Sequence, residues 1–284
     1  MKTFVQAAVA FSTAFVMGNA SAALILPPAG TLSVQYDDAF SYSTRVLDYF
    51  DPGAGWTDKA GTGNLGVIVT TRSSGQQNPT NFPDPVVNPN DSPGPINGDW
   101  GGTSTSTLLV STLRDYLVAT FNATIPLFSF DQNETGGNPD LLVTAKVEII
   151  DGVGGSVLHT WALDNTLQAG DGNYDPTSKV TAPGTITIPD VLGTCPGNGP
   201  CTFENNVGSG QFDYIIFFPT MDLTPWADSN NLFKVTWSFD QVDDGGEEIT
   251  IFGLANTSTP EPGSLALIGL AGLAMVLMRK RKFV

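Results

Sequence analysis

The chain is poor in the residues on which most catalytic and metal sites depend. It has one histidine, His159, and two cysteines among 284 residues, too few for a usual zinc ligand set. A Ser-His-Asp hydrolase would need His159 as its base, and no Gly-x-Ser-x-Gly motif accompanies it. Strand alternation puts His159 on one face with Val157 and Trp161, so we expect it to point inward as a structural residue. No catalytic constellation is visible, and we predict that the protein is not an enzyme.

Basic residues are also scarce, with 12 Lys and Arg against 28 Asp and Glu, a net charge of −16. Five of the twelve, Lys2 and the run from Arg279 to Lys282, lie in the two terminal segments, which contain one acid, Glu261. The intervening body therefore keeps seven basic and 27 acidic residues. Such a surface repels polyanions, which excludes nucleic acid as an expected partner.

The body lacks a convincing helical period of apolar residues, and alternation with period two takes its place. In Val143–Ile149 and Phe233–Phe239 every second residue is apolar and the others are polar, the pattern of half-buried antiparallel strands. Asp151–Gly155 is typical of a hairpin connection, and Asp243–Gly246 is expected to join the last two strands likewise. Further short strands are expected at 32–36, 66–71, 105–111, 116–125, 156–163, 185–188, 212–218 and 248–252.

These patterns predict an all-β protein, an antiparallel two-sheet sandwich of which the jelly roll is one form. Residues 73–106 are rich in Pro, Asn, Asp and Gly and are expected to form one long loop. Too few strands precede this loop to make a sandwich of their own. We therefore predict one exported domain over residues 23–259.

The N-terminus has the three parts of a secretory signal peptide. Lys2 supplies the positive charge, Phe4–Met17 is apolar, and Ala20-Ser21-Ala22 is a small-residue cleavage site. We expect residues 1–22 to be removed on export. In an exported protein, Cys195 and Cys201 are expected to form a local disulfide.

The C-terminus combines a short rigid motif, an apolar segment and a basic cluster. The motif consists of Pro260, Glu261 and Pro262, the apolar segment is Leu265–Met278, and the basic residues are Arg279, Lys280, Arg281 and Lys282. The apolar helix would be roughly 21 Å long at 1.5 Å per residue, short of the roughly 30 Å hydrocarbon core. It therefore suits a transient stop in the membrane, with a permanent anchor as the alternative. The basic cluster should remain cytoplasmic.

This three-part tail resembles the PEP-CTERM sorting signal of Gram-negative bacteria. The resemblance covers residues 260–284 and implies an exosortase as processing partner. It also implies an inner-membrane intermediate, and then the cell surface or extracellular matrix as the destination. The setting that it implies is exopolysaccharide production and biofilm formation, where many such proteins are structural or adhesive.

Two loops carry oxygen side chains at alternate positions, as calcium loops do. One contains Asp171, Asn173 and Asp175, and the other contains Asp131 and Asn133. Both lack the glutamate that completes an EF-hand, and the same residues are common in turns. Calcium therefore remains an open prediction at these loops.

Three hypotheses follow for the exported body. The first is a structural or adhesive surface or matrix protein that contacts extracellular polysaccharide. The second is a calcium-assisted carbohydrate-binding module, for which Trp100 is the best-placed exposed aromatic residue. The third is a secreted hydrolase that uses His159 or a pair of carboxylates.

Overall fold

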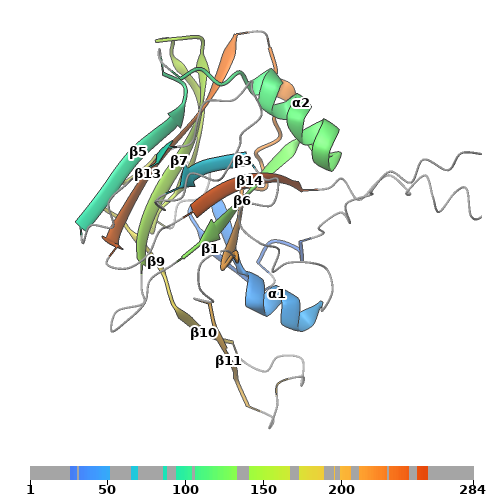
Figure 1. Ribbon diagram of the computed structural model, residues 1–284, viewed down its shortest axis with the longest axis vertical. Coiled ribbons are helices and arrows are strands. Elements are labelled where there is room, and N and C mark those ends of the chain that lie inside the picture. Colours follow the sequence, from blue (N-terminus) through green and yellow to red (C-terminus); the bar gives the residue numbers. More distant parts are fainter. Residues whose placement is uncertain are drawn as a thin grey trace, which may run out of the picture.

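The computed structural model describes the greater part of the exported body. The described residues are 26–30, 32–51, 65–69, 86–87, 94–103, 106–132, 141–166, 173–188, 195, 199–205, 211–228, 230–242 and 248–254. Within them two antiparallel sheets pack against each other (Figure 1). The predicted all-β, two-sheet sandwich is confirmed.

The first layer is a seven-stranded sheet with the order β1-β2-β12-β6-β14-β3-β4. Its strands are β1 (Ser33–Tyr36), β2 (Ala39–Ser43), β3 (Leu65–Val69), β4 (Val86–Val87), β6 (Ile125–Asp131), β12 (Tyr214–Phe217) and β14 (Glu248–Leu254). All neighbours are antiparallel except β3 and β4, which are parallel. The apolar strands β6 and β12 lie inside this sheet, as expected of strands with little polar surface.

The second layer is a five-stranded sheet in which β5-β13-β7-β8 follow in order and β9 also pairs with β7. Its strands are β5 (Gly94–Gly101), β7 (Leu141–Asp151), β8 (Val157–Leu163), β9 (Val180–Ala182) and β13 (Asn231–Val242). The strands β7 and β8 form the predicted hairpin. A separate two-stranded ribbon, β10 (Thr185–Ile188) with β11 (Cys201–Glu204), projects from the sandwich (Figure 1).

The core between the sheets follows from alternation along the strands. On β13, Phe233, Val235, Trp237 and Phe239 are all buried, whereas Lys234 and its polar neighbours lie on the outer face. Trp161 on β8 joins the same core. Each of these aromatic side chains buries a large apolar surface and so stabilises the packing of the two layers.

Close packing of β5 on β13 explains a run of glycines. Gly98 lies opposite Trp237, and a Cβ atom on Gly98 would come within 2.4 Å of Trp237 Cζ2. At Gly101 a Cβ atom would come within 2.3 Å of the Phe233 carbonyl oxygen, and φ is +74° there. A side chain at either position would clash, so these glycines serve a strand and not a loop.

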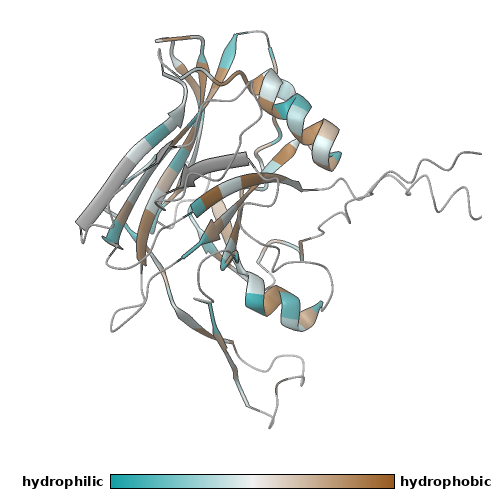
Figure 2. Ribbon diagram, in the orientation of Figure 1, coloured by the Kyte–Doolittle hydropathy of each residue, from teal (hydrophilic) through white to brown (hydrophobic). Residues whose placement is uncertain are grey.

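Two α-helices lie within the described residues, and neither was expected. The first, α1 (Thr44–Phe50), begins at Ser43, whose side chain accepts a hydrogen bond from the Val46 amide, a usual helix N-cap. The second, α2 (Val110–Phe121), occupies two segments in which strands were predicted, so those two predictions are wrong. Figure 2 shows hydrophilic and hydrophobic residues alternating around both helices.

The burial of α2 gives the reason for that error. Val110, Leu113 and Leu117 are buried, and their spacing of three and four residues puts them on one side of the helix. They join the core between the sheets. On the opposite face of the seven-stranded sheet, α1 covers a smaller cluster consisting of Tyr42, Leu47, Leu127, Ile215 and Phe252.

The pairing of the strands in the two sheets corrects two further predictions. The predicted loop over residues 73–106 contains β5, a full strand of the five-stranded sheet. The last two strands do not form a hairpin, because β13 belongs to the five-stranded sheet and β14 to the seven-stranded sheet. The predicted disulfide between Cys195 and Cys201 is present and lies at the start of β11.

Candidate functional site

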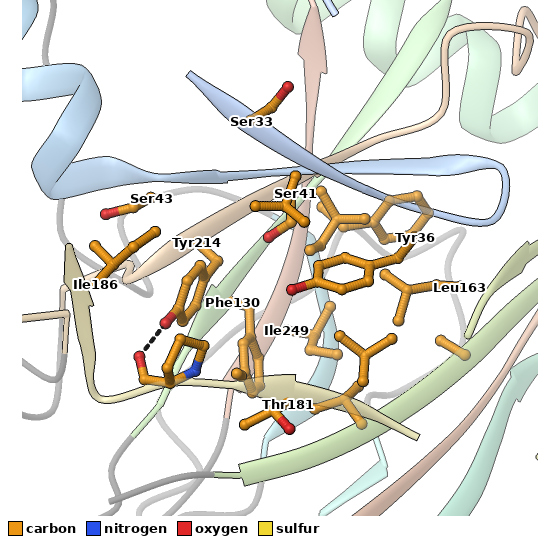
Figure 3. A pocket seen from close by; sticks show the side chains of 18 of the residues that line it. Ser33, Tyr36, Ser41, Ser43, Phe130, Leu163, Thr181, Ile186, Tyr214 and Ile249 are labelled. Atoms are coloured by element: carbon orange, nitrogen blue, oxygen red, sulfur yellow. Dashed lines mark hydrogen bonds between the residues drawn. The ribbon is translucent and has the colours of Figure 1, made fainter. Parts of the chain in front are cut away.

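An apolar cavity of about 440 Å³ lies between the two sheets. The seven-stranded sheet contributes Phe128, Phe130 and Ile249 to its lining, and the five-stranded sheet contributes Val147 and Leu163. Figure 3 labels Phe130, Ile249 and Leu163 of these walls, together with residues of β1, β9 and β10. No Asp, Glu, Lys, Arg or His is among the described residues that line it. The cavity is thus a hydrophobic compartment within an otherwise strongly acidic protein.

A hydrogen-bond network anchored on Asn205 borders one side of the cavity. The Asn205 side chain accepts a bond from Ser43 Oγ at 2.6 Å and donates to the Tyr214 hydroxyl at 2.9 Å. The Tyr214 hydroxyl in turn donates to the Pro183 carbonyl oxygen (Figure 3). This network ties α1, β12 and the β9–β10 turn together, and it satisfies polar atoms that would be costly to bury alone.

The hydroxyl group of Tyr36 has different surroundings from that of Tyr214. Its ring lies across the cavity with the hydroxyl directed toward the middle of the lining residues (Figure 3). Burial raises the pKa of Tyr36, and its hydroxyl makes no hydrogen bond with the described residues that would offset this effect. The hydroxyl therefore stays neutral at physiological pH and remains available to a molecule in the cavity.

A second hollow, of about 700 Å³, lies on the surface beside β8. Three rings meet there: His159 lies 4.3 Å from Trp161 and 5.4 Å from Trp226, measured between ring centroids. Trp226 belongs to the short 3-10 helix η1 (Thr224–Trp226). His159 is exposed, Trp226 is half-buried, and Trp161 is buried beneath them. We call this hollow the aromatic groove.

Polar groups flank the rings of the aromatic groove. They belong to Asp38, Thr160, Thr220 and Asp222. Asp38 accepts a hydrogen bond from the Ala162 amide at 2.9 Å, which ties the β1–β2 turn to the edge of β8. Partial burial alone would raise the pKa of Asp222, but hydrogen bonds from Thr224 and Thr124 outweigh it and lower the pKa. That carboxylate is therefore charged at neutral pH.

The position of His159 differs from the sequence prediction. It does share a face of β8 with Val157 and Trp161, but both Val157 and His159 are exposed. The alternation is correct, whereas the expected burial is wrong, since only the Trp161 end of β8 lies over the core. The contact with Trp226 joins residues 67 positions apart, and no local pattern in the sequence signals it.

Trp100 was predicted to be an exposed ligand-binding residue, and its placement corrects that prediction. It is 1% exposed, lies on β5, and packs edge-on against Phe233 with 6.3 Å between ring centroids. Neither face of its indole is open to a sugar. The neighbouring glycines suggested a loop, but they are there because β5 lies so close to β13.

The predicted calcium loops are only partly described. Asp171 and Asn133 lie outside the described residues, whereas Asn173, Asp175 and Asp131 lie within them. Asp175 caps a turn by accepting hydrogen bonds from the amide and hydroxyl of Thr177, and Asp131 is fully buried. Among the described residues no three His, Cys, Asp or Glu side chains come together to hold a metal ion.

The terminal targeting segments also lie outside the described residues. This applies to Ala20 and Ala22 of the signal peptide, to the sorting motif from Pro260 to Pro262, and to Leu265–Met278. In the described part of the chain, no helix has the length and apolar character needed to cross a membrane. The predicted signal cleavage and membrane segment therefore stay predictions.

Comparison with known proteins identifies two regions. Residues 24–239 match a family model described as a domain of unknown function (DUF8239). Residues 258–282 match the PEP-CTERM protein-sorting motif, which confirms the resemblance seen in the tail. No curated protein and no solved structure matches the chain.

Proposed function

Since the chain belongs to the DUF8239 family and carries a PEP-CTERM sorting motif at its C-terminus, we propose that it is a structural or adhesive protein of the cell surface or extracellular matrix. The motif marks an exported protein that an exosortase recognises. The proposed role beyond export is attachment to the exopolysaccharide of a biofilm. The strongly acidic body supports display outside the cell, because a high net charge favours solubility.

The way in which the tail joins the body supports display at a surface. The last strand, β14, lies inside the seven-stranded sheet between β6 and β3 and ends at Leu254. Five residues separate Leu254 from Pro260, a span of at most roughly 20 Å for an extended chain. A protein held by its sorting motif would therefore keep its folded body close to the site of attachment.

Processing is tested by intact-mass measurement of the protein isolated from its own cells. We expect the mature form to lack residues 1–22 and the segment from about Gly263 onward. A variant without residues 260–284 should fold but appear in the medium or periplasm. Glu261→Ala serves as the finer variant, because it alters the motif and leaves the apolar segment and basic cluster intact. Mature surface protein that retains Lys282 would favour a permanent anchor.

The aromatic groove favours a second, more specific function, the direct binding of a polysaccharide. Aromatic rings stack on the apolar faces of sugar rings, while neighbouring carboxylates and hydroxyls accept and donate hydrogen bonds to sugar hydroxyls. The groove brings together Trp226 and His159 with Asp38 and Asp222. Since Asp222 is held in its charged form, it offers a strong acceptor.

The test is binding of the mature protein to extracellular polysaccharide purified from the same cells. Trp226→Ala should weaken binding by roughly five- to 150-fold if the indole stacks on a sugar, since stacking and burial of one aromatic ring contribute on the order of 1–3 kcal/mol. Val153→Ala, an exposed residue outside the groove, is the matched control. Unchanged binding by Trp226→Ala would refute this function without touching the sorting proposal. A parallel binding measurement in the presence of a chelator tests whether calcium assists polysaccharide binding.

A further inference from the structure

We propose that the cavity between the sheets is a binding site for one uncharged, lipophilic small molecule with a single hydrogen-bonding group. This inference goes beyond surface display and polysaccharide attachment, and it concerns a different part of the molecule from the aromatic groove. Four properties of the cavity carry the argument: its size, its lack of charge, the orientation of Tyr36 and the position of its opening.

The size of the cavity exceeds an ordinary packing defect. Its volume is about 440 Å³, whereas voids in well-packed cores rarely exceed the volume of a water molecule. Dedicated small-molecule pockets span roughly 300–1,000 Å³. An engineered apolar cavity of roughly 150 Å³ holds one benzene, so this one has room for about three times as many atoms. That size suits a single chain or a small ring system.

The chemistry of the lining selects the class of ligand. Valine, isoleucine, leucine and phenylalanine side chains dominate it, and its described residues carry no charge. A carboxylate or phosphate inside this space would lose its hydration without gaining a partner, which is strongly unfavourable. The ligand must therefore be neutral over the part that enters. An apolar surface of this kind also does not retain ordered water well.

The hydroxyl of Tyr36 supplies the one polar contact that we assign. The other tyrosine of the lining, Tyr214, already donates to Pro183 and accepts from Asn205. The Tyr36 hydroxyl, like that of any tyrosine, is neutral at physiological pH, and it points among the lining residues (Figure 3). It is therefore placed to donate a hydrogen bond to a hydroxyl or carbonyl oxygen of the ligand.

An opening lies where β1, the edge strand of the seven-stranded sheet, faces β9 and the projecting ribbon. Val34 and Thr181 line the cavity and are also exposed to solvent. Ile186 and Ile188 on β10 border the same side and are half-buried. A small molecule can therefore enter past β1 and β10 without the two sheets separating.

The experiment uses the processed protein isolated from its own cells, with the fluorescent dye N-phenyl-1-naphthylamine as a probe. We expect saturable binding at one site, and displacement of the dye by octan-1-ol and by 1-chlorooctane. Native mass spectrometry of the same preparation would show whether a small neutral molecule accompanies the protein. Octanoate at neutral pH should displace the dye at least about tenfold less well than octan-1-ol, because its charge cannot be buried.

Two variants locate the site. Ala145→Trp places an indole into the cavity from β7 and should abolish dye binding, whereas Val153→Trp adds the same ring at an exposed position in the β7–β8 turn and should leave binding unchanged. Tyr36→Phe should weaken the binding of octan-1-ol roughly three- to tenfold, the usual contribution of one hydrogen bond. The same variant should change the binding of 1-chlorooctane by less than about twofold.

The outcomes are decisive in both directions. Folded wild-type protein that shows no saturable dye binding would overturn the proposal. Dye binding that persists in Ala145→Trp would place the dye on the surface and overturn it as well. If Ala145→Trp does not fold, Tyr36→Phe provides the test. An equal loss of affinity for octan-1-ol and 1-chlorooctane, or no loss of affinity for either, would contradict the assigned contact.

Discussion

Replacing Asn205 by alanine offers the sharpest test of how the cavity wall is held together. The side chain is fully buried and makes hydrogen bonds with Ser43, Tyr214 and Pro183. Its loss removes the acceptor to which the Ser43 hydroxyl donates, while Ser43 keeps the bond from the Val46 amide and Tyr214 keeps its bond to Pro183. Three lost bonds of about 1 kcal/mol each therefore lower the free energy of unfolding by about 3 kcal/mol.

A double-mutant cycle separates this network from a simple change in packing. Ser43→Ala removes the N-cap of α1 and the donor to Asn205, and we expect a loss of about 2 kcal/mol. Because both single variants break the same bond, the double variant should lose about 1 kcal/mol less than the sum of the two. Thr187→Ala is the control, since its bond to Thr202 is exposed and should change stability by less than about 0.5 kcal/mol.

The measurement is urea unfolding followed by tryptophan fluorescence, with thermal melts as a second reading. A loss of about 3 kcal/mol corresponds to a fall in Tm of roughly 6–12 °C for a domain of this size. A change below about 0.5 kcal/mol in Asn205→Ala would refute the reasoning. Full additivity in the double variant would show that the Ser43–Asn205 bond contributes nothing.

Three further predictions concern single features of the fold. Replacing Cys195 and Cys201 together by serine opens a loop of seven residues and should lower the free energy of unfolding by about 2 kcal/mol on the chain-entropy model, as measured in urea without reductant. Gly98→Ala forces a Cβ atom onto Trp237 and should lower the free energy of unfolding by about 1–3 kcal/mol. An unchanged free energy of unfolding in the same assay would disprove the close approach of the Gly98 backbone to the Trp237 ring. Burial raises the pKa of Glu248, so above its unfolded pKa the charged form destabilises the folded state. Glu248→Gln should therefore raise Tm at pH 7, and the difference should vanish as the pH falls below the ordinary pKa of glutamate; an equal gain at both pH values would exclude this cause.

The sequence allowed strands to be predicted where apolar and polar residues alternate strictly along the chain. Phe233 to Phe239 alternate strictly, and their burial follows that alternation. In α2 the helical spacing of Val110, Leu113 and Leu117 is present, but β-branched and aromatic neighbours favoured a strand by local preference. Packing against the core decided the outcome there.

The sites depend on distances that sequence patterns do not contain. Trp100 lies among glycines that resemble a turn, and only the approach of β5 to β13 shows why they are needed. Asn205 meets Ser43 across 162 positions of sequence, and the aromatic groove depends on η1 folding back over β8. The cavity depends on the spacing between two sheets. None of these long-range relations has a local signature.

The position of β14 has a mechanical consequence. A pull on the C-terminal tail, directed along the strand, would not peel away an edge but would load an interior strand. The backbone ladders of β14 with β6 and with β3 would bear that load together and in shear. Rupture then requires many bonds to fail nearly at once, whereas an edge strand can unzip one bond at a time. If the sorting tail holds the body at a surface, as proposed, this arrangement lets the body resist a pull on its point of attachment.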